Sequence, residues 1–394
     1  MPRGARRIAA LALVGALAGG CTAGEGPPAE GTDGGPPVER EYWPTADWRT
    51  ADPADHGFDA DELAEVERMV DEAYTSVRSI LIVRDGFLVY ERYWDGVDAS
   101  DGHDVRSVTK SVVSALVGIA LADGAIESLD QTVGELLADH LPPDADPRMA
   151  EVTVRQLLAM SSGLPGDDPT IAGDPTILGE IDRSPDRIRA ELGLPLDAAP
   201  GVQWRYSNVS SDLLAAAVED ATGRSLLDFA RERLFGPLGI ETDGAYEPVV
   251  IGWPPTPEQI AQYNASAVAW PTDAQGYHWG ALGLRLPARD LAKFGFLYLN
   301  GGLWDGDQIV PADYVRESTA PSDLSTGSRD SYGWQWWMAD DSDQRAYSAR
   351  GYGGQVIEVV PGLDLVAVVT ADPEIPRGDG HTLVNTFITP AAED

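Results

Sequence analysis

The chain has 394 residues, of which 43% are hydrophobic and 11 are tryptophan, so a large core can form and global disorder is excluded. The 64 acidic residues outnumber the 28 lysines and arginines, and the formal net charge of −36 disfavours nucleic acids and anionic membrane surfaces as partners. A single cysteine excludes both an intrachain disulfide and a cysteine-based zinc site.

The N-terminal segment has the pattern of an export signal. Three arginines within residues 3–7 precede an apolar run over residues 8–18, which is too short to span a bilayer. Cys21 follows this run closely, and the arrangement resembles a bacterial lipoprotein signal. The resemblance implies that residues 1–20 are removed and that Cys21 carries lipid, so acyl chains alone would anchor the exported protein to the outer face of the cell membrane. An ordinary secretory signal with an incidental cysteine, and hence a secreted protein, is the alternative.

The remaining chain divides into a predicted tether and one predicted domain. Residues 21–50 are rich in Gly, Pro and Glu and have no periodicity, which is typical of a flexible linker. Residues 51–394 contain the periodic segments. Residues 79–83 and 87–93 are β-rich and flank Arg84-Asp85-Gly86, which predicts a hairpin.

A predicted helix over residues 107–122 is apolar on nearly every face and is therefore expected to be buried. Strands near both ends of the domain, with helices between, predict one sheet assembled from about residues 55–105 and 330–390 and a helical insertion subdomain. The further helices are expected at 151–160, 210–222, 225–235, 287–300 and about 382–388, and the C-terminal strands at 355–360 and 363–371.

The helix at residue 107 begins with Ser107-Val108-Thr109-Lys110, the only Ser-x-x-Lys in a chain that has just two lysines. Residues three apart share one helix face, so the Lys110 amine can reach the Ser107 hydroxyl. The helix dipole and the Ser107 N–H favour a developing oxyanion, and a lysine in apolar surroundings is costly to keep charged. These features indicate a nucleophile and its base. A surface lysine beside an N-capping serine is the alternative.

Two further segments carry candidate site residues. Tyr206-Ser207-Asn208 lies in a predicted loop before an apolar helix, where a tyrosine can exchange protons with a nearby serine. The run Ala349–Gln355 contains Gly351, Gly353 and Gly354 before a predicted strand, so a ligand can approach the backbone closely and a main-chain N–H can complete an oxyanion hole. A glycine-rich bulge without a ligand is the alternative for this run.

Together, these motifs resemble the serine β-lactamase and penicillin-binding-protein superfamily, in particular the branch with class C β-lactamases, D-alanyl-D-alanine peptidases, esterases and 6-aminohexanoate-dimer hydrolases. The resemblance covers about residues 55–390 and includes the segments 152–165, 234–240 and 283–295. It implies an α/β (α+β) fold with an antiparallel sheet. It also implies that Ser107 is acylated, that Lys110 and Tyr206 share proton transfer, that the Ser107 and Tyr352 amides form the oxyanion hole, and that Asn208, Gly351 and Gly353 contact substrate.

The sequence departs from this family at its third motif. The positions commonly read Lys-Ser/Thr-Gly or His-x-Gly, whereas this chain has Ala349-Arg350-Gly351. The cation that would hold a β-lactam or peptide carboxylate is therefore absent unless Arg350 turns inward. We expect a serine hydrolase acting on a small neutral ester or amide, with a β-lactamase or D-alanyl-D-alanine carboxypeptidase as the alternative.

A lipid-anchored binding protein of the same fold, without turnover, is the alternative from another class. Other chemistries have little support, because the chain has no Gly-x-Ser-x-Gly, no His-Glu-x-x-His and no phosphate-binding loop. We therefore expect no cofactor and no metal. The expected partner is a small ester, amide or peptide-like molecule.

Overall fold

The computed structural model describes residues 40–166, 181–251, 255–339, 346–375 and 379–392. The expected signal, Cys21 and most of the expected tether lie outside these residues. The folded unit includes Arg40 and the described residues that follow it. It thus includes residues 40–50, which we expected in the tether: Trp48 is buried in the core, and the Arg40 guanidinium binds the Asp364 carboxylate at 2.6 Å.

The predicted hairpin forms from β1 (Val77–Arg84) and β2 (Phe87–Tyr93). Asp85 and Gly86 between the strands have φ of 53° and 85°. Two successive residues with positive φ make the tight turn whose twist matches that of a β-hairpin, and an Asp-Gly pair is well suited to it. The local sequence therefore accounts for this corner of the sheet.

Seven strands form one antiparallel sheet in the order β2-β1-β11-β10-β9-β8-β7. The two N-terminal strands join the C-terminal ones where β1 pairs with β11, from Val77 opposite Ala371 to Arg84 opposite Leu365. This confirms the antiparallel sheet built from both ends of the domain. The C-terminal strands are β7 (Asp330–Tyr332), β8 (Trp337–Ala339), β9 (Tyr347–Gly351), β10 (Gln355–Val360) and β11 (Leu365–Ala371).

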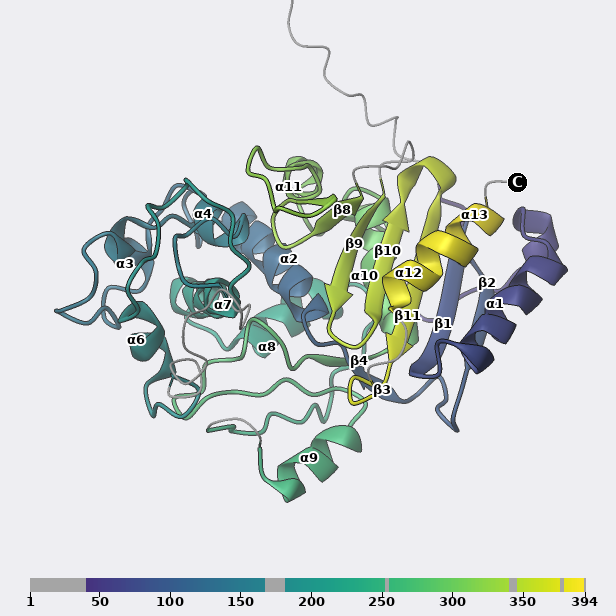
Figure 1. Cartoon of the computed structure of the whole chain (residues 1–394), viewed down its shortest axis with the longest axis horizontal. Helices are drawn as coiled ribbons and strands as arrows, with labels where there is room; N and C mark the ends of the chain where they lie inside the picture. Colours follow the sequence, from purple (N-terminus) through teal and green to yellow (C-terminus); the bar gives the residue numbers. More distant parts are fainter. Residues whose placement is uncertain (1–39, 167–180, 252–254, 340–345, 376–378, 393–394) are drawn as a thin grey trace, which may run out of the picture. The chain divides into compact units, whose positions relative to one another are not determined.

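Helices cover both faces of the sheet (Figure 1). On one face lie α1 (Ala60–Glu72), α12 (Gly380–Leu383), the helical turn Val384–Ile388 and α13 (Thr389–Ala391). On the other lie α10 (Ala288–Leu299) and α2 (Val108–Ala122). The expected elements did not include α1, although its buried residues Leu63, Val66 and Val70 follow helical spacing.

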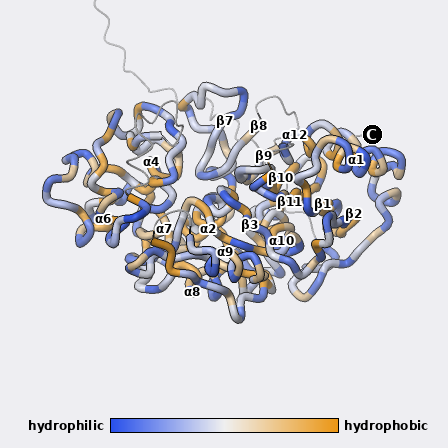
Figure 2. The backbone as a smooth tube through the Cα atoms, turned by 60° about the horizontal axis from the view of Figure 1, so that its bottom comes forward, coloured by the Kyte–Doolittle hydropathy of each residue, from blue (hydrophilic) through white to orange (hydrophobic). Residues whose placement is uncertain are grey.

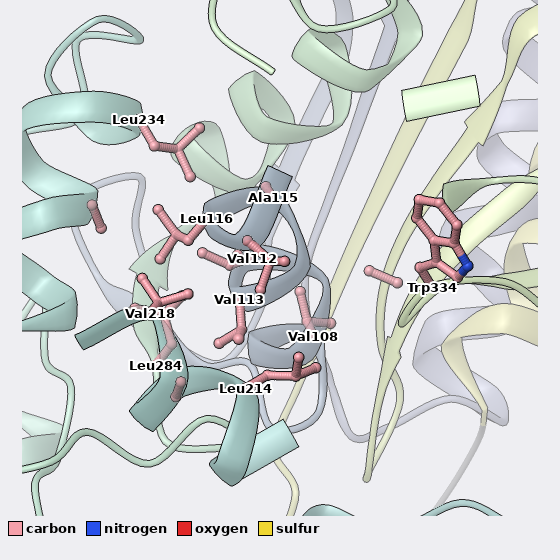
Figure 3. Packing of buried hydrophobic residues seen from close by; sticks show 14 of the residues in the cluster. Val108, Val112, Val113, Ala115, Leu116, Leu214, Val218, Leu234, Leu284 and Trp334 are labelled. Carbon is pink, nitrogen blue, oxygen red and sulfur yellow. The ribbon is translucent and has the colours of Figure 1, made fainter. Parts of the chain in front are cut away.

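The helical insertion surrounds α2 on the side away from the sheet. Side chains of α2 such as Val113 and Leu116 pack against Leu214 and Val218 of α7 (Asn208–Thr222) (Figure 3). Hydrophobic stretches gather around α2, α7 and α10 (Figure 2). Because α2 is buried on all sides, its first turn is held rigidly at the end of β9. The insertion also contains α3 (Val133–Leu136), α4 (Val154–Leu158), α6 (Arg187–Leu192) and α8 (Leu226–Ala230).

The remaining elements are short. Strands β3 (Gly102–Asp104) and β4 (Arg285–Pro287) pair with each other below the end of the main sheet in Figure 1, close to α9 (Pro257–Asn264). A second small pair is β5 (Leu303–Trp304) with β6 (Asp307–Gln308), followed by α11 (Ala312–Ser318). Within the described residues, no helix has the length and hydrophobicity needed to cross a membrane.

Candidate active site

The Ser-x-x-Lys motif lies at the start of α2, as predicted. Ser107 is the residue before the helix, and Lys110 is in its first turn with only 1% of its surface exposed. The Lys110 Nζ lies 3.3 Å from the Ser107 Oγ. A partly exposed hydroxyl therefore sits beside a fully buried amine, which excludes the surface-lysine alternative.

Two other groups hold the Lys110 amine. The Nζ lies 2.6 Å from the Asn208 Oδ1 and 2.7 Å from the carbonyl oxygen of Ala281. An ammonium group has three N–H donors, so it can donate to all three oxygens. A neutral amine that donates to Asn208 and Ala281 keeps its lone pair for the Ser107 hydroxyl proton. The arrangement thus suits a group that accepts a proton from Ser107 and returns it.

Asp212 is a site residue that the motifs did not identify. Its Oδ1 accepts the backbone N–H groups of Gly280 and Ala281 at 2.7 and 3.0 Å. It thereby fixes the peptide segment whose carbonyl binds Lys110. Asp212 and Asn208 lie four residues apart on α7, hence on one helix face, and an aspartate inside this apolar helix was the available signal.

A buried ionic network surrounds Asp212. The Arg187 guanidinium lies 2.9 Å from the Glu191 carboxylate and 3.5 Å from that of Asp212, with Asp273 at 3.3 Å. Burial raises the pKa of Asp212, and the positive charges of Arg187 and Lys110 oppose this rise. Charges buried this deeply are tolerated only when they are paired, so the network fixes the back wall of the site.

Tyr206 lies next to Lys110, but not in the way we expected. The Lys110 Nζ is 5.0 Å from the centre of the Tyr206 ring, which stacks on Trp337 with centroids 5.9 Å apart. Trp204 and Tyr332 complete an aromatic cluster around the ring. In the described part of the chain, no hydrogen bond joins the Tyr206 hydroxyl to Ser107 or Lys110. Tyr206 is therefore at the site, and it contacts Lys110 through its ring and not through its hydroxyl.

The glycine-rich segment meets the turn that precedes Ser107. Gly351 ends β9, and a Cβ there would lie 2.3 Å from the Val105 carbonyl oxygen and 3.1 Å from the Arg106 Cβ. Only glycine permits this approach without displacing the backbone. Tyr352 follows, with a side chain 67% exposed. Among the described residues, neither the Ser107 nor the Tyr352 backbone N–H donates a hydrogen bond, so both are available to an oxyanion.

The turn itself is conformationally unusual. Arg106, directly before Ser107, has φ of 49°, a left-handed conformation that costs a non-glycine residue about 1 kcal/mol. The Asp104 carboxylate stabilises this turn, because its Oδ1 accepts the Arg106 N–H at 3.0 Å. The strained turn directly precedes Ser107.

The departure at the third motif has a clear structural outcome. Ala349 faces the core and is fully buried. The Arg350 guanidinium binds the Asp330 carboxylate at 2.5 Å and the Ser348 hydroxyl at 2.7 Å. Arg350 is therefore already engaged by an acidic partner. Among the residues that the structure describes, no three His, Cys, Asp or Glu side chains gather as metal ligands.

Comparisons with known proteins identify the family of this chain. A family model described as "Beta-lactamase" matches residues 66–382. A protein of Escherichia coli O157:H7 named "Putative D-alanyl-D-alanine carboxypeptidase" is 23% identical over 391 residues, covering 85% of this chain and 88% of that protein. The 6-aminohexanoate-dimer hydrolase of Paenarthrobacter ureafaciens is 24% identical over 334 residues, covering 78% and 75%.

A solved structure gives the same result for the fold. EstCE1, described as "a hydrolase with promiscuous acyltransferase activity", has a TM-score of 0.66 at 19% identity, over 85% of this chain and 98% of that one. The family model spans most of the described domain, and the relatives match it over most of their own length. The chain therefore belongs to the β-lactamase family, and it has the fold of the serine hydrolases in that family.

Proposed function

We propose that this protein hydrolyses a small uncharged ester or amide through an acyl-enzyme on Ser107. The observation that carries the proposal is the buried Lys110 amine 3.3 Å from the Ser107 hydroxyl. A buried lysine with two fixed acceptors is a costly feature that a protein acting only by binding does not need. This argument favours an enzyme over a silent binding protein of the same fold.

The reaction follows from the positions of these groups. The Lys110 amine takes the proton of Ser107 as the Ser107 Oγ attacks the substrate carbonyl, and a new C–O bond forms. The Ser107 and Tyr352 N–H groups then stabilise the oxyanion. Collapse breaks the bond to the leaving group, which takes a proton from the Lys110–Tyr206 pair. Water attacks the acyl-enzyme in the same way, and the acid and Ser107 are released.

The hydrogen bonds support Lys110 as the first base. Its Nζ is within reach of the Ser107 Oγ, whereas the Tyr206 contact is made by the ring. Tyr206 then acts on the leaving group, once substrate has entered and the site has adjusted around it. Geometry before substrate binding often differs in this way from that of the reacting complex.

The expectation of an uncharged substrate follows from the residues at positions 349 and 350. A carboxylate brought into a partly desolvated site without a partner costs several kcal/mol, and Arg350 is engaged by Asp330. A neutral substrate avoids this cost. The relative named as a D-alanyl-D-alanine carboxypeptidase is the reason to keep a carboxylate-bearing peptide as the second candidate.

The test compares kcat/KM for p-nitrophenyl acetate, nitrocefin and a D-Ala-D-Ala peptide with one enzyme preparation. We expect the ester to be hydrolysed fastest. A clear preference for nitrocefin or the peptide would contradict the neutral-substrate assignment, and Arg350→Ala would then show whether that side chain holds the carboxylate.

We further propose that Cys21 anchors the exported protein to the membrane by lipid. The support is the charged, apolar and cysteine-terminated order of the N-terminal residues. Cys21→Ser should release the protein from the membrane fraction while soluble esters are still hydrolysed. An unmodified Cys21 in the mature protein would contradict the anchor.

A further inference from the structure

A cavity of about 700 Å³ borders the candidate site and is not used by the chemistry described above. Arg106, directly before Ser107, lines it, and so does Leu282, directly after the Ala281 carbonyl that binds Lys110. Pro373 forms another part of the wall, and a Cβ on Gly353 would lie 2.5 Å from the Pro373 Cα. The wall therefore adjoins the nucleophile turn, the lysine anchor and the loop that carries Tyr352.

The cavity has the size and lining of a small-molecule site. Its volume falls within the ~300–1,000 Å³ common for ligand pockets. Most of its accessible lining is apolar, with side chains such as Val97, Val250, Ile260 and Leu282. An apolar portion of a ligand would leave water on entering it, which favours binding.

The arginines in the wall already have hydrogen-bond or ion-pair partners. Arg78 binds the Asp372 carboxylate at 3.1 Å, and Arg106 binds Glu374 at 3.1 Å and Asp104 at 3.0 Å. Arg285 donates to the carbonyl oxygens of Ser266 and Asn264. Among the described residues of the wall, four acidic side chains accompany these three arginines, so an uncharged ligand fits the cavity better than an anion: Asp101, Asp104, Asp372 and Glu374.

Two polar atoms in the wall lack partners. The His103 Nε2 and the Trp279 Nε1 are buried without a hydrogen-bond partner within the described residues, and the two side chains are 6% and 7% exposed. Burial and the nearby charge of Arg285 lower the pKa of His103 to about 4, so its imidazole is neutral at pH 7. Both atoms lie beneath the cavity surface, and the neutral imidazole adds no positive charge to the wall.

Helix α9 forms the outer wall and has no buried side chain. It stands apart from the other helices in Figure 1. Ile260 of α9 lines the cavity and is 39% exposed. This partly exposed apolar side chain in the wall suits the entry of an apolar group.

We propose that this cavity binds the larger, uncharged and mainly apolar portion of the substrate, an alkyl or acyl chain. The proposal deepens the proposed hydrolase function, on which its kinetic test rests. This alkyl or acyl chain belongs either to the acyl group or to the leaving group of the substrate. The two pairs of esters in the kinetic experiment distinguish these positions.

The first experiment measures binding by calorimetry and does not depend on turnover. Octanamide is the uncharged probe, and octanoate is its charged counterpart. We expect octanamide to bind at least about tenfold more tightly than octanoate, because the wall cations already have partners. Ile260→Trp should fill the cavity from an exposed position and abolish octanamide binding. The matched control is Val249→Trp, which lies beside the cavity but does not line it and should leave binding unchanged.

The second experiment compares kcat/KM for p-nitrophenyl acetate and p-nitrophenyl octanoate, and for ethyl and octyl acetate. We expect the long chain to be preferred in one of these pairs, and Ile260→Trp should remove about tenfold or more of that preference through KM. Hydrolysis of p-nitrophenyl acetate and ethyl acetate, the short-chain substrates, should be unaffected in both variants. Equal octanamide binding by Ile260→Trp, Val249→Trp and the unmodified protein, or no octanamide binding at all, would overturn the cavity assignment. If the unmodified protein binds octanamide but hydrolyses none of these esters, the proposed function is refuted and the cavity assignment is not.

Discussion

The Asp212 carboxylate accepts the backbone N–H of Ala281, and the carbonyl of that same residue binds the Lys110 amine. A residue with no direct contact to Ser107 thus positions the group that does contact it. Asp212 is a positioning residue in this account. Its role is separable from bulk stability because an asparagine retains the accepting oxygen.

We predict that Asp212→Ala lowers kcat by about 100-fold, because a small displacement of the lysine anchor misplaces the base. Asp212→Asn should recover most of the loss, and KM should change little in either variant. Urea unfolding would measure the accompanying loss of stability, expected at about 3 kcal/mol for the alanine variant, which removes a partner of Arg187. Equal kcat in the two variants would contradict a positioning role.

Lys110 and Tyr206 should behave as one proton-transfer unit. Lys110→Arg replaces the amine with a guanidinium, which cannot give up its proton near neutral pH, so kcat should fall by ~10²–10⁴. Tyr206→Phe keeps the ring contacts with Lys110 and Trp337 but lacks the hydroxyl, so kcat should fall in this variant too. The double variant should be little worse than either single one. Additive losses in kcat would mean that the two residues act separately.

Gly351 should be intolerant of even one methyl group. Gly351→Ala places a Cβ against the Val105 carbonyl and must move the end of β9, and with it the Tyr352 N–H. Loss of an oxyanion donor predicts a fall in kcat of about 100-fold or more. Gly193→Ala is the matched control, since its nearest contact would be 3.3 Å and its φ is −80°. Full activity in Gly351→Ala would rule out this part of the oxyanion hole.

The buried carboxyl of Glu358, on β10, predicts that the stability of the protein depends on pH. Glu358 is fully buried, and neither of its carboxyl oxygens has a hydrogen-bond partner in the described residues. Burial raises its pKa from 4.5 to about 7, and the charge of Arg350 opposes this. The folded state therefore holds a proton that the unfolded state releases. The stabilising effect is complete below about pH 4.5 and is lost as the pH rises to about 7.

The comparison with Glu358→Gln measures this effect. The free energy of unfolding of the variant, relative to the unmodified protein, should rise by about 3 kcal/mol between pH 4.5 and 7.5. His381 lies 3.8 Å from Glu358, and burial lowers its pKa to about 4; it titrates in both proteins and cancels in the difference. The exposed Glu258→Gln should leave the pH dependence unchanged. A flat difference for Glu358→Gln would show that this carboxyl has an ordinary pKa when folded.

Local signals made part of this molecule predictable. The Asp85-Gly86 turn and the apolar helix after Ser107 each depend on neighbouring residues, and both formed as expected. The reach from Lys110 to Ser107 is likewise set by one helical turn. Strand β9 was expected only as part of the sheet region 330–390, without bounds of its own, because the glycines around Arg350 are also typical of a loop. Its pairing with β10 holds it in the sheet.

Long-range features were beyond the reach of the motifs. Ala281 is 171 residues from Lys110, and Asp212 is 69 residues from Ala281, so no local pattern could join them. The cavity beside Arg106 is also assembled from distant segments. The assignments of Ser107, Lys110, Tyr206 and Tyr352 to catalytic roles stay predictions that the contacts support.

The central claim is that Ser107 forms a covalent acyl-enzyme, and intact-mass spectrometry after fluorophosphonate treatment tests it most directly. We predict a single adduct per chain that peptide mapping assigns to Ser107, together with loss of ester hydrolysis. Ser107→Ala should show neither adduct nor hydrolysis while remaining folded. Labelling that persists in Ser107→Ala, or an adduct on another residue, would contradict the account.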